Sequence, residues 1–123
     1  YIDVVRLAQR DVEFISVKEQ ELFGLSHMTL GGHLADWWNM PASIVDAIRW
    51  HNDPVRAKVD PDLAAIVHMA DVFVHRAQIG ASGNGRIPDF HPSMRQVLSM
   101  SEEDLVATET SVMAKMQAEN LPF

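Results

Sequence analysis

Residues 26–38 read SHMTLGGHLADWW, and this stretch decides the fold class. His27, Gly31, Leu34 and Trp38 are spaced like the residues on one face of an α-helix. Because Ser26 stands just before this face and is a favourable N-cap residue, we expect a helix from Ser26 to about Trp38. Trp38 is predicted to lie in the core.

Two adjacent glycines, Gly31 and Gly32, fall in the middle of this predicted helix. A glycine inside a helix costs about 1 kcal/mol relative to alanine. Such a cost is tolerated where a neighbouring helix comes too close for a side chain. The pair therefore predicts a close helix–helix contact near His27.

The same helical spacing recurs before and after this stretch. Residues 1–22 carry an apolar face that predicts one long helix, ending near Gly24, a residue type favoured at helix ends. Pro41 suits the first turn of a further helix, which we expect to end before Asp53.

Three more helices are predicted, over residues 61–79, over residues 92–98, and from residue 102 onward. Asp60 followed by Pro61 is typical of a helix start, and Ser101 with Asp104 resembles a capping box. Residues 80–85, GASGNG, predict a loop. No stretch alternates like a strand, so the predicted fold class is all-α.

Composition limits the classes of function. The 123 residues fit one domain, and 47% hydrophobic content can build a core. Ten Lys and Arg against 17 Asp and Glu give a net charge of -7, which argues against binding to nucleic acid. The chain has no cysteine, which is compatible with the cytoplasm, and no apolar stretch long enough to span a membrane. We expect a single cytoplasmic helical domain over residues 1–123.

Three polar residues occupy apolar faces of the predicted helices. His27 lies on the first face described above, His51 follows Ile44 and Ile48, and Asp71 lies among Ala70, Val72, Phe73 and Val74. A single histidine in such a place is usually a hydrogen-bonded core residue. A carboxylate is costly to bury alone, so Asp71 is predicted to be buried with His27 or His51 as its partner.

Glu19 interrupts the apolar face of residues 1–22 in the same way. It either joins the cluster of His27, His51 and Asp71 or lies at a solvated helix end. The other histidines lie off the apolar faces. We expect His33 and His68 at the surface or its boundary, and neither His75 nor His91 has a partner at helical spacing.

Four spaced motifs follow one another along the chain: Glu19-x-Glu21-Leu22-Phe23-Gly24-x-x-His27-x-x-x-Gly31, Trp38-x-x-Pro41, Ala47-Ile48-x-x-His51-x-x-Pro54 and Ile66-Val67-x-x-Ala70-Asp71. In order and spacing they resemble the HDOD family of bacterial signalling domains over residues 19–74. That family is related to HD-type metal-dependent phosphohydrolases and to HD-GYP phosphodiesterases of cyclic-di-GMP. The resemblance implies an HD-domain-like bundle of about five to six helices. Since the family's domain is longer, it also implies that this chain is a C-terminal portion.

The resemblance also implies a site. In the HD-type hydrolases the positions matching His27, His51 and Asp71 are metal ligands, and the position after the second histidine is often another histidine. This chain has Asn52 there, a poor ligand, and it contains no His-Asp dipeptide. Two imidazoles and one carboxylate resemble a weak facial triad for a divalent metal. We expect no cofactor and no tightly bound metal; if a metal binds, these three residues hold it.

Two hypotheses of function remain. In the first, the chain is a non-catalytic signal-transduction output or interaction module, and His27, His51, Asp71, Glu19 and Asn52 form the remnant of a metal site. Its partners would be signalling protein domains or a second copy of the chain. In the second, it is part of a metal-dependent phosphohydrolase acting on a nucleotide or a cyclic dinucleotide. Asn52 and the absent His-Asp dipeptide favour the first.

Overall fold

The computed structural model describes residues 1–77 and 88–119. This part of the chain is all-α, as predicted, and contains seven α-helices and one short 3-10 helix, η1, but no strand. The elements are α1 (Ile2–Arg10), α2 (Ile15–Phe23), α3 (His27–Trp37), α4 (Ala42–Trp50), η1 (Pro54–Arg56), α5 (Pro61–Arg76), α6 (Pro92–Val97) and α7 (Glu102–Ala118). None of these helices is long and apolar enough to cross a membrane.

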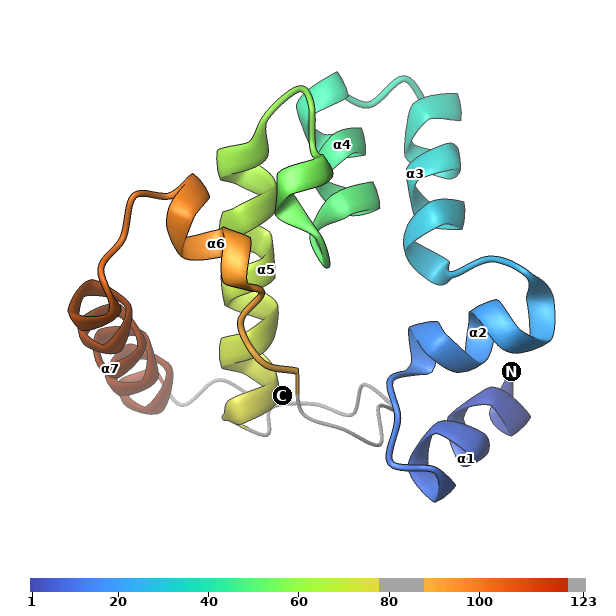
Figure 1. The fold of residues 1–123 in the computed structure, drawn as a ribbon, viewed down its shortest axis with the longest axis horizontal. Coiled ribbons are helices and arrows are strands. Elements are labelled where there is room, and N and C mark those ends of the chain that lie inside the picture. The colour runs from blue at the N-terminus through green and yellow to red at the C-terminus, as the bar shows by residue number, and fades with distance from the viewer. Residues whose placement is uncertain (78–87, 120–123) are drawn as a thin grey trace.

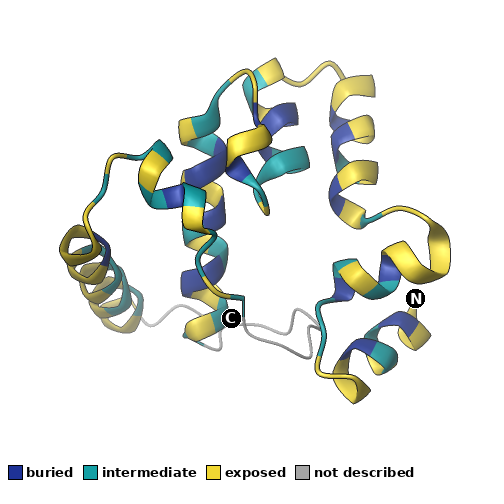
Figure 2. Cartoon of the chain, in the orientation of Figure 1, coloured by how far each residue is buried: buried dark blue, intermediate teal, exposed yellow. Residues whose placement is uncertain are grey.

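The helices form an arch around α5 rather than one round bundle (Figure 1). On one side α4, α3 and then the α1–α2 hairpin continue the arch, and on the other side α6 and α7 do so. The buried residues lie on the facing sides of these helices (Figure 2).

Three small apolar clusters hold the arch together instead of one large core. Their buried members are Ala65, Phe73, Met94 and Leu105 between α5, α6 and α7; Ala47, Ala57 and Ala64 between α4, η1 and α5; and Val4, Ala8 and Ile15 between α1 and α2. The middle cluster is built from alanines, so α4 and α5 can approach each other closely.

Three of the predicted helix starts are confirmed by their capping side chains. The Ser26 side chain accepts a hydrogen bond from the backbone N–H of Thr29, and Asp60 accepts one from Leu63. Ser101 and Asp104 form the predicted capping box at the start of α7. Each of these helix starts depends on a side chain that binds a backbone N–H three residues later, so a local sequence pattern is sufficient to predict it.

The predicted close contact at the glycine pair is also confirmed. A Cβ atom added to Gly31 would lie 3.2 Å from Cγ2 of Ile48, and one added to Gly32 would lie 2.8 Å from Nε of Arg49. Both neighbours belong to α4, so the glycines let α3 and α4 pack closely. The predicted loop at residues 80–85 lies outside the described residues.

The predicted single helix over residues 1–22 is wrong. Helix α1 ends at Arg10, Val12 adopts a left-handed conformation with φ 53°, and α2 starts at Ile15. The break lets α1 fold back onto α2, so that Val4 and Ala8 are buried against Ile15. A continuous helix would keep these apolar residues apart, which explains why packing overrides the helical pattern. Gly24 does end α2, in the left-handed conformation with φ 77°.

The faces of α3 and α5 that are buried also differ from the predicted ones. Trp38, expected in the core, is 66% exposed, and the buried residues of α3 are Met28, Gly32 and Ala35. In α5 likewise, Ala64 and Ala65 are buried while Val67 and Val74 are not. Small residues allow close packing, so Gly32, Ala35, Ala64 and Ala65 are buried on these helices. Larger apolar residues divide between the two sides: Met28, Val72 and Phe73 are buried, whereas Trp38, Val67 and Val74 are not.

Candidate functional site

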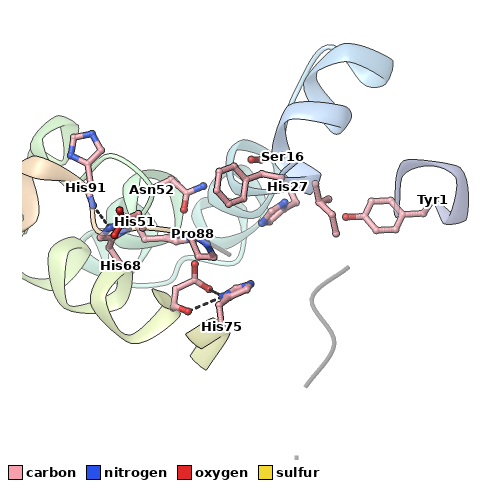
Figure 3. A pocket seen from close by; sticks show the side chains of 13 residues that line it. Tyr1, Ser16, His27, His51, Asn52, His68, His75, Pro88 and His91 are labelled. Atoms are coloured by element: carbon pink, nitrogen blue, oxygen red, sulfur yellow. Dashed lines mark hydrogen bonds and ion pairs between the residues drawn. The ribbon is translucent and has the colours of Figure 1, made fainter. Parts of the chain in front are cut away.

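A cavity of about 610 Å³ lies in the hollow of the arch (Figure 3). Its walls come from α2, the start of α3, the end of α4, α5 and the segment before α6. The lining residues are Tyr1, Phe14, Ile15, Ser16, His27, His51, Asn52, His68, Asp71, His75, Pro88, Asp89 and His91. Five of the six histidines of the chain are among them, and the exposed His33 is not.

The structure therefore brings four of the five sequence-predicted site residues to one cavity: His27, His51, Asn52 and Asp71. The fifth, Glu19, lies directly behind His27. The helix faces that carry His27, His51 and Asp71 converge, although they border an open hollow instead of a closed core. The lining also includes His68, His75 and His91, which the helical pattern did not select.

Glu19 anchors His27 at the start of α3. Its carboxylate is only 3% exposed and accepts hydrogen bonds from the backbone N–H of His27 and from Nδ1 of the same residue, the latter at 2.7 Å. The Tyr1 hydroxyl donates a third hydrogen bond, at 3.1 Å. Glu19 is therefore buried against His27 and does not lie at a solvated helix end. Burial is tolerated because donors surround the carboxylate.

His51 is the C-cap residue of α4, and its Nδ1 lies 2.9 Å from the backbone oxygen of Ile48. Because a carbonyl oxygen only accepts, Nδ1 is the donor and carries the proton of the neutral ring. The lone pair of His51 is therefore on Nε2. Asn52, which follows, is exposed at the mouth of the cavity.

Asp71 is not buried, so this prediction is wrong. Its side chain is 37% exposed, because α5 turns Val72 and Phe73 inward and leaves Asp71 at the edge of the cavity. The ring of His75, one turn later, lies 3.4 Å from a carboxylate oxygen of Asp71 and 2.7 Å from its backbone oxygen. Figure 3 shows His75 on α5, away from His27 at the start of α3.

His68, expected at the surface or its boundary, is buried and only 5% exposed. Its Nε2 accepts a hydrogen bond of 2.8 Å from the backbone N–H of His91, a residue 23 positions along the chain. The two rings also meet edge to face, with centroids 6.3 Å apart. No periodic pattern reveals such a contact, because it joins α5 to a segment without regular structure.

The electrostatics of His68 favour a neutral ring. Burial and then the neighbouring His91 lower the pKa of His68, while Asp71 and the backbone carbonyl of His51 act in the opposite direction. Its Nδ1 is buried and makes no well-formed hydrogen bond in the described part of the chain.

His91 has a polar neighbour at each ring nitrogen. Nδ1 accepts the backbone N–H of Ser93 at 3.1 Å, which makes His91 the N-cap of α6, and Nε2 lies 3.4 Å from a carboxylate oxygen of Asp53. The neutral ring therefore carries its proton on Nε2, facing Asp53.

The cavity differs from a preformed metal centre. Among residues 1–77 and 88–119, no three His, Asp or Glu side chains are grouped closely enough to hold a metal ion. No Lys or Arg belongs to the described lining, and Arg49 packs over Gly32 on α3. The lining thus combines imidazoles with the carboxylates of Asp71 and Asp89.

Comparison with known proteins gives one match. Residues 1–54 match the family model of the HDOD domain, whereas no curated protein and no solved structure matches the chain. The match starts before the first motif described above and ends before Asp71. It contains Glu19, His27, His51 and Asn52. Residues 1–54 of this chain are therefore similar to the HDOD domain.

Proposed function

We propose that this chain is part of a signal-transduction output module that acts by binding other proteins, and that its cavity is the degenerate form of an HD-type metal site. The observation that carries this proposal concerns the three residues at the metal-ligand positions, each of which already has a polar neighbour within the protein. His27 is bound by Glu19, His51 by a carbonyl of its own helix, and Asp71 lies beside His75. Each of the three side chains has a different neighbour, and the three do not meet at one position where they could bind a single metal ion.

The chemistry of the lining supports a non-catalytic role. Hydrolysis of a phosphodiester requires metal ions or Arg and Lys groups that stabilise negative charge in the transition state. The described lining supplies carboxylates and imidazoles, with Asn52 in place of the second histidine of the enzymes. These groups do not provide the positive charge that the reaction needs.

An exposed apolar surface on α3 supports the binding role. Leu30, Leu34 and Trp37 follow one another at helical spacing and are 50%, 38% and 76% exposed, and Trp38 lies beside them. Exposed apolar residues in such a group are typical of protein interfaces. Signalling domains and a second copy of the chain are the partners that we propose.

One observation favours the alternative, a metal-dependent phosphohydrolase. In His27 and in His51 Nδ1 is engaged by an oxygen, which leaves Nε2 as the nitrogen available to a metal. Metal-binding histidines commonly have such a partner. In this alternative function, His27, His51 and Asp71 bind a divalent metal weakly.

One experiment separates the two functions. The full-length protein, purified without chelator, is analysed for metals and assayed on cyclic-di-GMP and on nucleoside monophosphates with manganese or iron. We expect no stoichiometric metal and no turnover above that of the metal alone. Metal-dependent turnover that is lost in His51→Ala but kept in His33→Ala, a histidine outside the cavity, would establish the hydrolase instead.

A further inference from the structure

The cavity in the hollow of the arch has the size of a small-molecule site. Its volume of about 610 Å³ lies within the range of roughly 300 to 1,000 Å³ that is usual for such sites. His27, His51 and His75 border it from different parts of the chain (Figure 3). In the described part of the chain the polar side chains are too far apart to share one metal ion. This spacing suits an organic molecule of several atoms, which can reach more than one wall.

The histidine nitrogens that are left for such a molecule are hydrogen-bond acceptors. Nδ1 of His27 lies 2.7 Å from the Glu19 carboxylate, and Nδ1 of His51 lies 2.9 Å from the backbone oxygen of Ile48. Since both oxygens only accept, each Nδ1 carries a proton, and in the neutral ring the lone pair is on Nε2. The His27 side chain is 56% exposed, so a ligand in the cavity can reach its ring. Both Nε2 atoms therefore favour a ligand that donates hydrogen bonds.

The carboxylate of Asp71 adds negative charge at the edge of the cavity. The other carboxylate of the lining, Asp89, is paired with Arg76 at 3.1 Å, which offsets its charge. Asp71 lies beside His75, whose Nδ1 is 2.7 Å from the backbone oxygen of Asp71 and 3.4 Å from its carboxylate. Nδ1 can donate to the backbone oxygen while the ring is neutral, so the pair needs no positive charge on His75. The Asp71 side chain is 37% exposed and thus accessible to a charged ligand.

We propose that the cavity binds a small planar organic cation of the amidinium or guanidinium class. The N–H groups of the ligand donate to the carboxylate of Asp71 and to Nε2 of His51, and its apolar part lies against Phe14 and Pro88, which line the same cavity. Amidinium and guanidinium groups are flat and carry several N–H donors in fixed directions, which suits a carboxylate and an imidazole on different walls.

The same groups disfavour an anionic ligand. A phosphate or carboxylate would face the charge of Asp71 and the lone pairs of His27 and His51, and the lining within residues 1–77 and 88–119 offers it no Lys or Arg. A cleft of one charge concentrates ligands of the opposite charge.

This inference rests on the part of the proposed function in which the cavity holds no stoichiometric metal, and it adds the class of ligand. The two can fail separately. The proposed function is tested by metal content and turnover, whereas the class of ligand is tested by selectivity among organic molecules of different charge.

The test is a titration of the full-length protein with benzamidine, benzamide and benzoate, which share an aromatic ring and carry a positive, a neutral and a negative polar group. Calorimetry measures the Kd, and the backbone amide NMR signals of Asn52 and Asp71 locate the bound ligand. We expect benzamidine to bind about tenfold more tightly than benzamide, as one charge-assisted hydrogen bond implies. Benzoate should leave these signals unchanged.

A matched pair of variants identifies the carboxylate that binds the cation. Asp71→Asn should raise the Kd of benzamidine by about tenfold, because it removes the charge and keeps the shape of the side chain. Asp62→Asn makes the same change at an exposed position of α5 outside the described lining, and it should bind benzamidine like the wild type.

Three results would overturn the proposal: benzoate or benzamide binding as tightly as benzamidine, no change in the signals of Asn52 and Asp71 with benzamidine, or the same Kd in Asp71→Asn and Asp62→Asn. If Asp71→Asn does not fold, the order of the three affinities in the wild-type protein decides.

Discussion

The carboxylate of Glu19 binds His27 twice, through the backbone N–H at the start of α3 and through the imidazole Nδ1 at 2.7 Å. One buried side chain thus fixes both the start of a helix and the orientation of a cavity residue. The same carboxylate joins α2 to α3 through His27, and α1 to α2 through the Tyr1 hydroxyl.

Removing this carboxylate should destabilise the fold. Glu19→Ala leaves three donors without their acceptor, and we expect the free energy of unfolding to fall by about 2 to 4 kcal/mol. Urea unfolding followed by circular dichroism measures the change. Glu21→Ala, at an exposed position on the same helix, is the control and should change stability by about 0.5 kcal/mol or less. Equal effects of the two substitutions would contradict the structural role of Glu19.

The contact of Gly32 with Arg49 should appear as coupling between the two residues. Gly32→Ala places a Cβ atom 2.8 Å from Nε of Arg49, so we expect a loss of about 1 kcal/mol in spite of the better helix propensity of alanine. In an Arg49→Ala background the guanidinium is gone and only Cβ of residue 49 remains close, at 3.2 Å, so the same substitution should destabilise less than in the wild type. A double-mutant cycle with thermal unfolding measures the difference. Additive effects would show that the guanidinium does not restrict this position.

Asp71→Ala should have little effect on stability. The carboxylate is 37% exposed, and its neighbour His75 keeps the hydrogen bond to the backbone oxygen of residue 71 in the variant. We expect a loss of about 0.5 kcal/mol, as is typical of an exposed ion pair, in urea unfolding near neutral pH. A loss as large as that of Glu19→Ala would mean that Asp71 is a buried partner of His27 or His51 after all.

The stability of the protein should depend on pH through His68. Burial lowers the pKa of His68 below its ordinary value of 6.5, so the unfolded chain binds the proton more readily than the folded one. The contribution of His68 to the free energy of unfolding is complete at pH values above this ordinary pKa. It is lost as the pH falls from there toward the lowered pKa of the folded state.

Urea unfolding at a series of pH values checks this dependence. Stability should fall across this range in the wild type and fall less in His68→Gln, while His33→Gln should follow the wild type. A steeper fall in His68→Gln would reverse the sign and contradict the burial of a neutral ring.

The sequence by itself determined the fold class and the helix starts. Ser26, Asp60 and Ser101 each bind a backbone N–H three residues away, so local chemistry decides where α3, α5 and α7 begin. The glycine pair in α3 predicted a close helix contact, because only a close neighbour explains glycine inside a helix. His27, His51 and Asp71, which stand out by their helical spacing, all line one cavity.

Only the tertiary structure decided which helix faces are buried and how the cavity residues pair. Several helices are apolar on adjoining faces, and the closest packing of Gly32, Ala35 and Ala64 selects one of them, which leaves Trp38 exposed and buries His68. The bond from His91 to His68 joins residues 23 positions apart. Such a contact depends on where the chain returns to α5, and helical periodicity describes only neighbours within a few turns.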